Sequence, residues 1–120
     1  MIKIVVGGQM DKQKIEKIIN EYGNGKVETT VKTDIEGALA VKSGQADYYF
    51  GACATGSGGA LAMAIGILGA DKSISISIPG KLLSEEEIRE AVQGGKQAFG
   101  FVNTDAEKVI PILVDEILNK

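Results

Sequence analysis

The sequence predicts an α/β fold: a doubly wound parallel sheet of about five strands with helices on both faces, in a Rossmann-like, three-layer arrangement. Short apolar runs alternate along the chain with longer amphipathic segments, in a β–α order repeated five times. Such alternation is typical of parallel sheets with right-handed crossovers. A length of 120 residues suits a single domain over residues 1–120. We expect strand order 2-1-3-4-5 or its relative 3-2-1-4-5.

Five strands are predicted from apolar or alternating runs bounded by turn residues. The fourth run alternates strictly, with Ile74, Ile76 and Ile78 on one face. The predicted strands cover residues 2–6, 26–31, 47–51, 73–78 and 98–102.

A helix is predicted after each strand. The first helix places Ile15, Ile18 and Ile19 on one face and begins at Asp11, which is interpreted as its cap. Three later helices open with a Ser or Thr followed three residues on by Glu, the pattern of a capping box. These pairs are Thr33 with Glu36, Ser84 with Glu87, and Thr104 with Glu107. The predicted helices cover residues 11–22, 34–42, 59–69, 84–92 and 104–118.

The composition argues against several classes of protein. With a net charge of −3 and a single arginine, the chain lacks the clustered basic residues that bind nucleic acid. The absence of His and the presence of one Cys exclude imidazole metal sites, disulfides within the chain and four-Cys zinc sites, and we expect no cofactor. The longest apolar run, of about 13 residues, is too short to cross a bilayer, and the N-terminus lacks signal-peptide features. We therefore expect a cytoplasmic protein without a membrane partner.

The glycine-rich segment 51–59 is the most informative stretch. It contains four glycines, two hydroxyls and one thiol, and it lies between a strand and a helix at the edge of the sheet where ligands bind. No acidic residue occurs between residues 51 and 70, whereas the other predicted helices carry a carboxylate near their start. We predict that a small anionic metabolite binds there, held by backbone N–H groups, with a phosphate favoured over a carboxylate. The alternative is that Thr55 or Ser57 caps the helix.

The predicted ligand-binding residues come from this segment and from the loop after the first strand. Gln9 in that loop is placed to contact the ligand, although a solvated turn is the alternative. Lys81, at the end of the fourth strand, offers a positive charge. The predicted ligand-binding residues are Gly8, Gln9, Thr55, Gly56, Ser57, Gly58 and Gly59.

Cys53 is the candidate catalytic residue. It follows the third predicted strand, beside the N–H groups of the next helix, where a thiol gains thiolate character. A thiolate suits a nucleophile or a general base. The alternative is a small buried core residue.

The predicted helix 59–69 is apolar around its whole circumference. One face of a small sheet cannot cover such a helix, so we predict a homo-oligomer, in the simplest case a dimer. The alternative is that neighbouring helices of the same chain cover it.

Residues 7–12, 46–53 and 55–64 resemble the small bacterial YhfU-like proteins, and the resemblance extends along nearly the whole chain. That family has no established activity, so this resemblance implies no function.

Two further resemblances, each confined to a short stretch, imply an activity. Residues 53–58 are similar to the Cys-Gly-Thr-Gly-x-Gly loop of the ribose-5-phosphate isomerase B and galactose-6-phosphate isomerase group. This likeness implies a sugar-phosphate isomerase with Cys53 as the base. The chain departs from that group where Gly8 and Gln9 replace an Asp-His pair, and it lacks the group's phosphate-binding His and Arg residues.

The same stretch resembles the Cys-x-x-Gly loop of sugar phosphotransferase IIB subunits, in which the Cys carries phosphate. This second likeness implies a phosphocarrier or regulatory subunit that acts through a protein partner. A non-catalytic oligomeric subunit is the third hypothesis.

Overall fold

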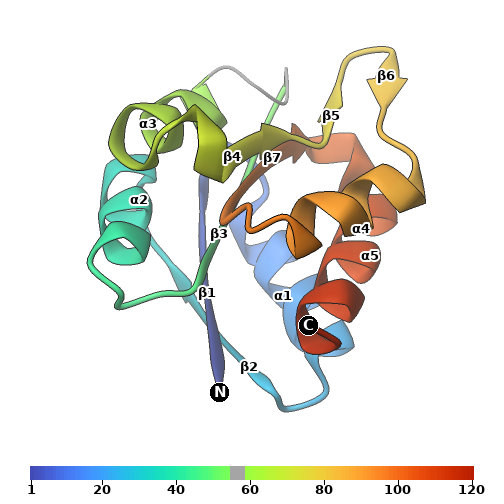
Figure 1. Ribbon diagram of the computed structural model, residues 1–120, viewed down its shortest axis with the longest axis horizontal. Coiled ribbons are helices and arrows are strands. Elements are labelled where there is room, and N and C mark those ends of the chain that lie inside the picture. Colours follow the sequence, from blue (N-terminus) through green and yellow to red (C-terminus); the bar gives the residue numbers. More distant parts are fainter. Residues whose placement is uncertain (55–58) are drawn as a thin grey trace.

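The computed structural model of the protein describes residues 1–54 and 59–120. It contains a five-stranded parallel sheet between two layers of helices (Figure 1). The elements are β1 (Ile2–Gly8), α1 (Lys12–Gly23), β2 (Val27–Val31), α2 (Asp34–Lys42), β3 (Tyr48–Cys53), α3 (Gly59–Leu68), η1 (Ala70–Lys72), β4 (Ser73–Ser75), β5 (Ser77–Ile78), β6 (Lys81–Leu82), α4 (Glu85–Gln93), β7 (Ala98–Val102), η2 (Asn103–Asp105) and α5 (Ala106–Leu118). The predicted fold class is therefore confirmed.

The strand order is β2-β1-β3-β7-β4, so both predicted orders are wrong. The last strand, β7, inserts between β3 and β4 instead of lying at the edge. All five residues of β7 are buried and apolar or glycine, as a strand covered on both faces requires. In contrast, β4 is short and carries Ser73 and Ser75, which suits an edge strand.

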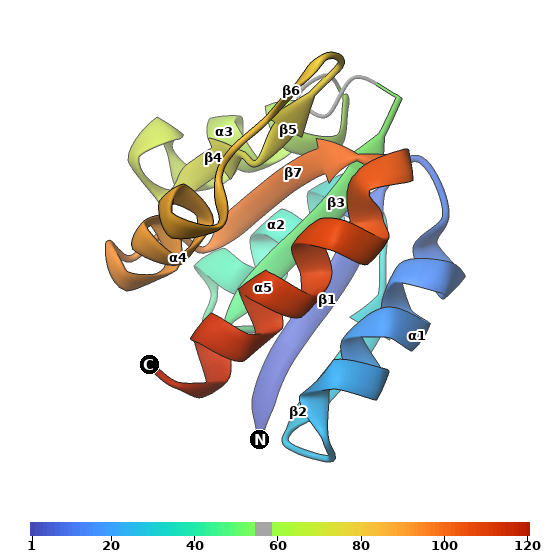
Figure 2. The same ribbon diagram turned by 90° about the vertical axis from the view of Figure 1, so that its right-hand side faces the viewer.

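The two faces of the sheet are covered by different sets of helices. Helices α1, α4 and α5 lie on one face and α2 and α3 on the other (Figures 1 and 2). The first face is filled by large rings, with Phe50 packed edge-on against Phe99 at a centroid distance of 5.7 Å. The second face is lined by smaller residues around Tyr49. Within the described ranges, no helix is both long and apolar enough to span a membrane.

The predicted fourth strand breaks at Ile76, which lies between β4 and β5 and whose N–H donates to the Gly100 carbonyl at 2.7 Å. Strand β5 then leaves the parallel sheet and pairs with β6 in an antiparallel hairpin, residues 77–82. Gly80 adopts a φ of +79°, and the turn it makes gives β5 a partner in the chain that follows. Ile78 is therefore 40% exposed and not part of the core, contrary to the alternation pattern.

Two of the three predicted capping boxes are present, at the starts of α2 and α4. The third is wrong, because Thr104 lies in the turn η2 and α5 begins at Ala106. Glu107 instead forms a salt bridge with Lys14 at 3.0 Å, which joins α5 to α1.

Asp11 occupies the N-cap position of α1 without making a side-chain capping bond, so its predicted role as a cap is wrong. Its left-handed backbone, with φ of 56°, turns the chain into the helix. Its carboxylate accepts a hydrogen bond from Asn103 Nδ2 at 3.2 Å, which ties the ends of β1 and β7 together.

Candidate functional site

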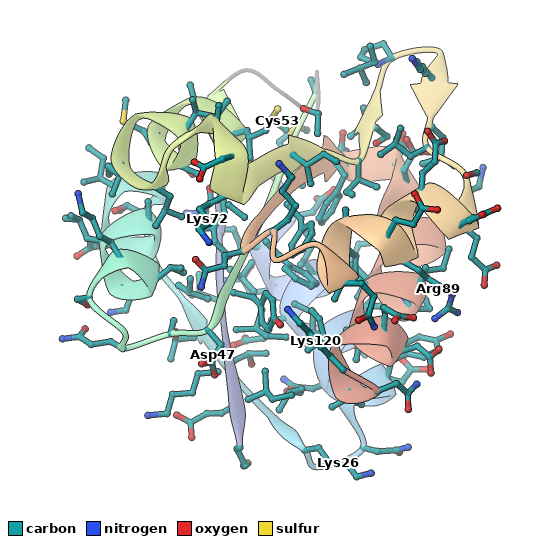
Figure 3. The ribbon with its side chains drawn as sticks, viewed as in Figure 1. Lys26, Asp47, Cys53, Lys72, Arg89 and Lys120 are labelled. Atoms are coloured by element: carbon teal, nitrogen blue, oxygen red, sulfur yellow. The ribbon has the colours of Figure 1, made fainter. Side chains whose placement is uncertain are left out.

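The carboxyl ends of β1 and β3, where the ligand site is predicted, meet at one edge of the sheet, and β7 ends beside β3 at the same edge. Gly8 pairs with Ala52, and Cys53 pairs with Val102, so the last residues of these strands are neighbours. Figure 3 shows Cys53 at this edge, between α3 and the β5–β6 hairpin.

Cys53 is the last residue of β3 and is 3% exposed. By strand alternation it shares the α2 and α3 face of the sheet with Tyr49. Such burial is what the alternative of a small buried core residue predicts. A sugar substrate and a phosphocarrier partner would both have to reach this sulfur, so the burial of Cys53 does not distinguish between these two functions.

The loop after β1 approaches β3 very closely. A Cβ on Gly8, whose φ is +84°, would lie 2.5 Å from both the N and the O of Ala52. The Gly8 N–H donates to Asp34 Oδ1, and the Gln9 N–H donates to the Ala52 carbonyl at 2.9 Å. The Gly8 N–H is thus already engaged, whereas the side chain of Gln9 is exposed and remains the ligand contact predicted from this loop.

Tyr49 and Asp34 lie beneath this edge and were not predicted as part of the site. The Tyr49 hydroxyl donates to Asp34 Oδ1 at 3.0 Å, and the tyrosine is fully buried. Its ring occupies space that three glycines leave open, since a Cβ on Gly7, Gly37 or Gly51 would lie within 3.0 Å of it.

Burial raises the pKa of Tyr49 above its ordinary value of 10.0, and the negative charge of Asp34 raises the pKa further. Tyr49 is therefore a neutral hydrogen-bond donor. A negative charge on Cys53 also raises the pKa of Tyr49, although less than burial and Asp34 do. The phenol therefore lies within electrostatic range of the thiol.

Four predicted ligand-binding residues, Thr55, Gly56, Ser57 and Gly58, lie outside the described residues. Gly59 is the first residue of α3, and the first turn of that helix contains no acidic residue. The prediction of an anion at this helix start stays a prediction.

A cleft of about 290 Å³ opens between the β5–β6 hairpin and the start of α5. Lys81, which the sequence placed at this edge, lines it together with Lys108. Sequence reasoning missed Lys108, because the charge pattern of α5 does not reveal that the hairpin folds opposite its first turns.

A larger cavity, of about 440 Å³, lies at the amino end of the sheet, away from Cys53. Lys72, Lys96 and Lys120 line it, and Figure 3 shows Lys72 and Lys120 away from the Cys53 edge. The Lys96 ammonium donates to the Asp71 carbonyl at 2.9 Å. Since α4 and α5 end near this cavity, its lysines complement the partial negative charge of helix C-termini.

No group of three Cys, Asp or Glu residues within ranges 1–54 and 59–120 is arranged to hold a metal ion. Among the residues that the structure describes, this edge brings together the Cys53 thiol, the Tyr49 phenol, the carboxylates of Asp11, Asp34 and Asp105, and the ammonium groups of Lys81 and Lys108.

Comparison with known proteins gives a family and a fold. The family described as "Protein of unknown function DUF2620" matches residues 2–117. "Uncharacterized protein YhfU" of Escherichia coli strain K12 is 41% identical over 117 residues, which cover 98% of this chain and 99% of that protein. The Shigella flexneri protein of the same name matches equally well.

Two solved structures share the fold. Ribose-5-phosphate isomerase B of Giardia lamblia superposes with a TM-score of 0.71 at 16% identity, over 99% of this chain and 95% of that one. A ribose 5-phosphate isomerase of Thermotoga maritima gives 0.67, also at 16% identity, over 99% and 87% of the two chains. At this identity the likeness shows the fold alone.

Proposed function

Because the chain belongs to the DUF2620 family of proteins of unknown function, we propose a function from the site itself: isomerisation of a small phosphorylated sugar, with Cys53 as the base. The observation that carries the proposal is the position of Cys53. It is a buried thiol at the carboxyl end of β3, where the sheet edge meets the glycine-rich segment. The two isomerases with the same fold add support, since their names state ribose 5-phosphate as the substrate.

The chemistry requires one base that removes a proton and returns it. The Cys53 thiolate takes the proton from the carbon beside the aldehyde, and the C–H electron pair forms an enediolate. The resulting thiol delivers that proton to the former aldehyde carbon, while the hydroxyl proton moves to the former aldehyde oxygen. The product is the ketose, and the thiolate is restored.

The chain has no histidine, so the remaining contacts must come from other groups. We propose that backbone N–H groups of residues 55–59 and the hydroxyls of Thr55 and Ser57 hold ligand oxygens, with the Gln9 amide on the opposite side. Amides bind oxygen atoms without titrating near neutral pH, so the rate is expected to report the ionisation of Cys53.

Turnover of ribose 5-phosphate, followed by NMR, tests the proposal. The wild type is expected to form ribulose 5-phosphate, and C53S is expected to lose activity by about 10²- to 10⁴-fold while still binding the sugar. K17M, a change at an exposed residue of α1 on the opposite layer from Cys53, serves as the control with unchanged turnover. Absence of turnover by the wild type, or equal turnover by C53S, would overturn the proposal.

A second function is favoured by the exposed apolar face of α2 and α3. Ile35 and Leu39 on α2 are 51% and 50% exposed, and Met63 and Ile65 on α3 are 44% and 41% exposed. The two helices lie side by side (Figure 1), and we call the outer surface of this helical layer, which carries these exposed side chains, the α2–α3 face. We propose that a second copy of the chain covers it, because an apolar face on an otherwise charged domain is typical of an interface.

A further inference from the structure

We propose that the cleft between the β5–β6 hairpin and the start of α5 binds the phosphate group of the ligand, with Lys81 and Lys108 as its charged partners. This inference rests on the proposed function and assigns the two ends of the substrate to different places. The reacting carbons lie at Cys53, and the phosphate lies in the lysine-lined cleft.

The cleft brings together residues from two distant parts of the chain. Lys81 comes from the hairpin, whereas Thr104, Asp105 and Lys108 come from η2 and α5. Its volume of about 290 Å³ accommodates a phosphate together with bound water. Two ammonium groups and one hydroxyl are donors that suit a phosphate.

The two lysines are available to an anion. In the part of the chain that the structure describes, neither Lys81 nor Lys108 forms a salt bridge, whereas Lys14 pairs with Glu107. Asp105 is the one carboxylate that lines the cleft, so the lining keeps a net positive charge. Among the residues that line the cleft, both lysines attract a phosphate bound between them, and Asp105 repels it.

Glu87, at the start of α4, also lies within electrostatic range of Lys81. Hydrogen bonds from the backbone and the side chain of Ser84 are the main reason why the pKa of Glu87 is lowered, and Lys81 contributes the least. The Glu87 carboxylate accepts from the Ser84 N–H at 3.0 Å as part of the α4 capping box. Since the cap holds this carboxylate, Lys81 keeps its capacity to bind a ligand.

The cleft lies at the end of β7, and the thiol lies at the end of the neighbouring strand β3. Val102 lines the cleft and is the sheet partner of Cys53, and adjacent strands are about 4.8 Å apart. In this proposal one pentose phosphate, which is longer than this backbone spacing, extends past the end of β7 from the cleft to the thiol. Figure 2 shows the hairpin standing beside the carboxyl end of β7.

The hairpin is fixed at its base, which holds Lys81 in place. The Ser77 hydroxyl accepts a hydrogen bond from the buried Val102 N–H at 2.9 Å, and the Leu83 N–H donates to the Ile76 carbonyl at 3.0 Å. The first bond joins β5 to β7, and the second closes the base of the hairpin.

Backbone amide NMR during titration with inorganic phosphate, and separately with ribose 5-phosphate, tests the inference. In the wild type, the amide signals of Gly80, Lys81, Thr104 and Asp105 are expected to shift saturably with either probe. K81M and K108M are each expected to weaken binding about tenfold, since a charge-assisted hydrogen bond is lost. K72M, at the amino end of the sheet, is the matched control and is expected to bind as the wild type does.

The outcomes separate this inference from the proposed function. If ribose 5-phosphate binds and is isomerised but K81M and K108M bind it as tightly as the wild type, the cleft assignment is wrong and the proposed function stands. If inorganic phosphate shifts the cleft signals and no sugar phosphate is isomerised, the cleft is an anion site and the proposed function is wrong. If neither probe causes a saturable shift at the cleft, the inference is wrong.

Discussion

The hydroxyl of Tyr49 donates a hydrogen bond to Asp34 Oδ1 at 3.0 Å, and the same oxygen accepts the Gly8 N–H. One carboxylate thus joins the interior of β3, the start of α2 and the end of β1. Thr33 and Glu36 supply the cap of α2, which leaves Asp34 to turn back toward the sheet. This contact holds the edge of the sheet at which Cys53 lies.

Tyr49→Phe is expected to lower the free energy of unfolding by about 1 kcal/mol, because one hydrogen bond is lost while Asp34 keeps the Gly8 N–H. Urea unfolding of both proteins measures the difference. Tyr22→Phe, a change at a 47% exposed tyrosine on α1, is the control and is expected to have no effect. Equal stability of Tyr49→Phe and the wild type would show that the contact contributes nothing.

Stability at high pH should depend on Tyr49. Its pKa is raised in the folded state above 10.0, so the folded protein holds the proton more tightly than the unfolded chain does. This contribution is fully present below pH 10 and is lost as the pH rises toward the folded-state pKa. Unfolding measured at a series of pH values should show a steeper decline for the wild type than for Tyr49→Phe; parallel curves would contradict the account.

The glycines around the Tyr49 ring are expected to tolerate no side chain. A Cβ on Gly51 would lie 2.7 Å from the Tyr49 hydroxyl oxygen, and one on Gly7 would lie 2.5 Å from a ring carbon. Gly51→Ala and Gly7→Ala should each destabilise the protein by about 1–3 kcal/mol through overpacking. Gly66→Ala, in α3 with no atom within 4 Å of the added Cβ, is the matched control and should be neutral or stabilising. A loss at Gly66 equal to that at Gly51 would refute the packing argument.

Acid stability should depend on the contact between α4 and α5. The side chain of Gln93, followed by that of Arg89, donates hydrogen bonds that lower the pKa of Glu116 below 4.5. Because the folded-state pKa is lowered, the stabilisation is present above pH 4.5 and is lost as the pH falls through the folded-state pKa. Glu116→Gln should therefore flatten the decline in melting temperature below pH 4.5, and an unchanged decline would argue against this contact.

The α2–α3 face should control the oligomeric state. The wild type is expected to sediment as a dimer at micromolar concentration, and the double variant Leu39→Glu, Ile65→Glu as a monomer, because two charges enter the apolar interface. Tyr22→Glu, on the opposite layer, should remain dimeric. A monomeric wild type would exclude this interface.

The order of elements and the edge that carries the candidate site could be predicted from sequence because both depend on local patterns. The run Ala98–Val102 is apolar at every non-glycine position, and its bounds are those predicted. The capping boxes that begin at Thr33 and Ser84 are local as well. The insertion of β7 beside β3 could not be predicted, because strand order depends on long-range packing. The contrast between an apolar β7 and a serine-containing β4 was the available signal.

The candidate site was predicted in part. Cys53, Gln9 and Lys81 lie at the expected edge: Cys53 ends β3, Gln9 follows β1, and Lys81 lies in the hairpin that comes after β4. Asp34 was overlooked because its position in the capping sequence suggested only the start of a helix. Tyr49 was overlooked because a tyrosine in an apolar strand is typical of a core residue. Their hydrogen bond depends on how α2 packs against β3, which no local pattern contains.

The position of ribose 5-phosphate in crystals of the Cys53→Ser variant tests the central claim most directly. The account predicts electron density for the sugar at the carboxyl ends of β3 and β7, with its first two carbons against residue 53. Density in the amino-end cavity beside Lys72 and Lys120, or none at saturating sugar, would contradict it.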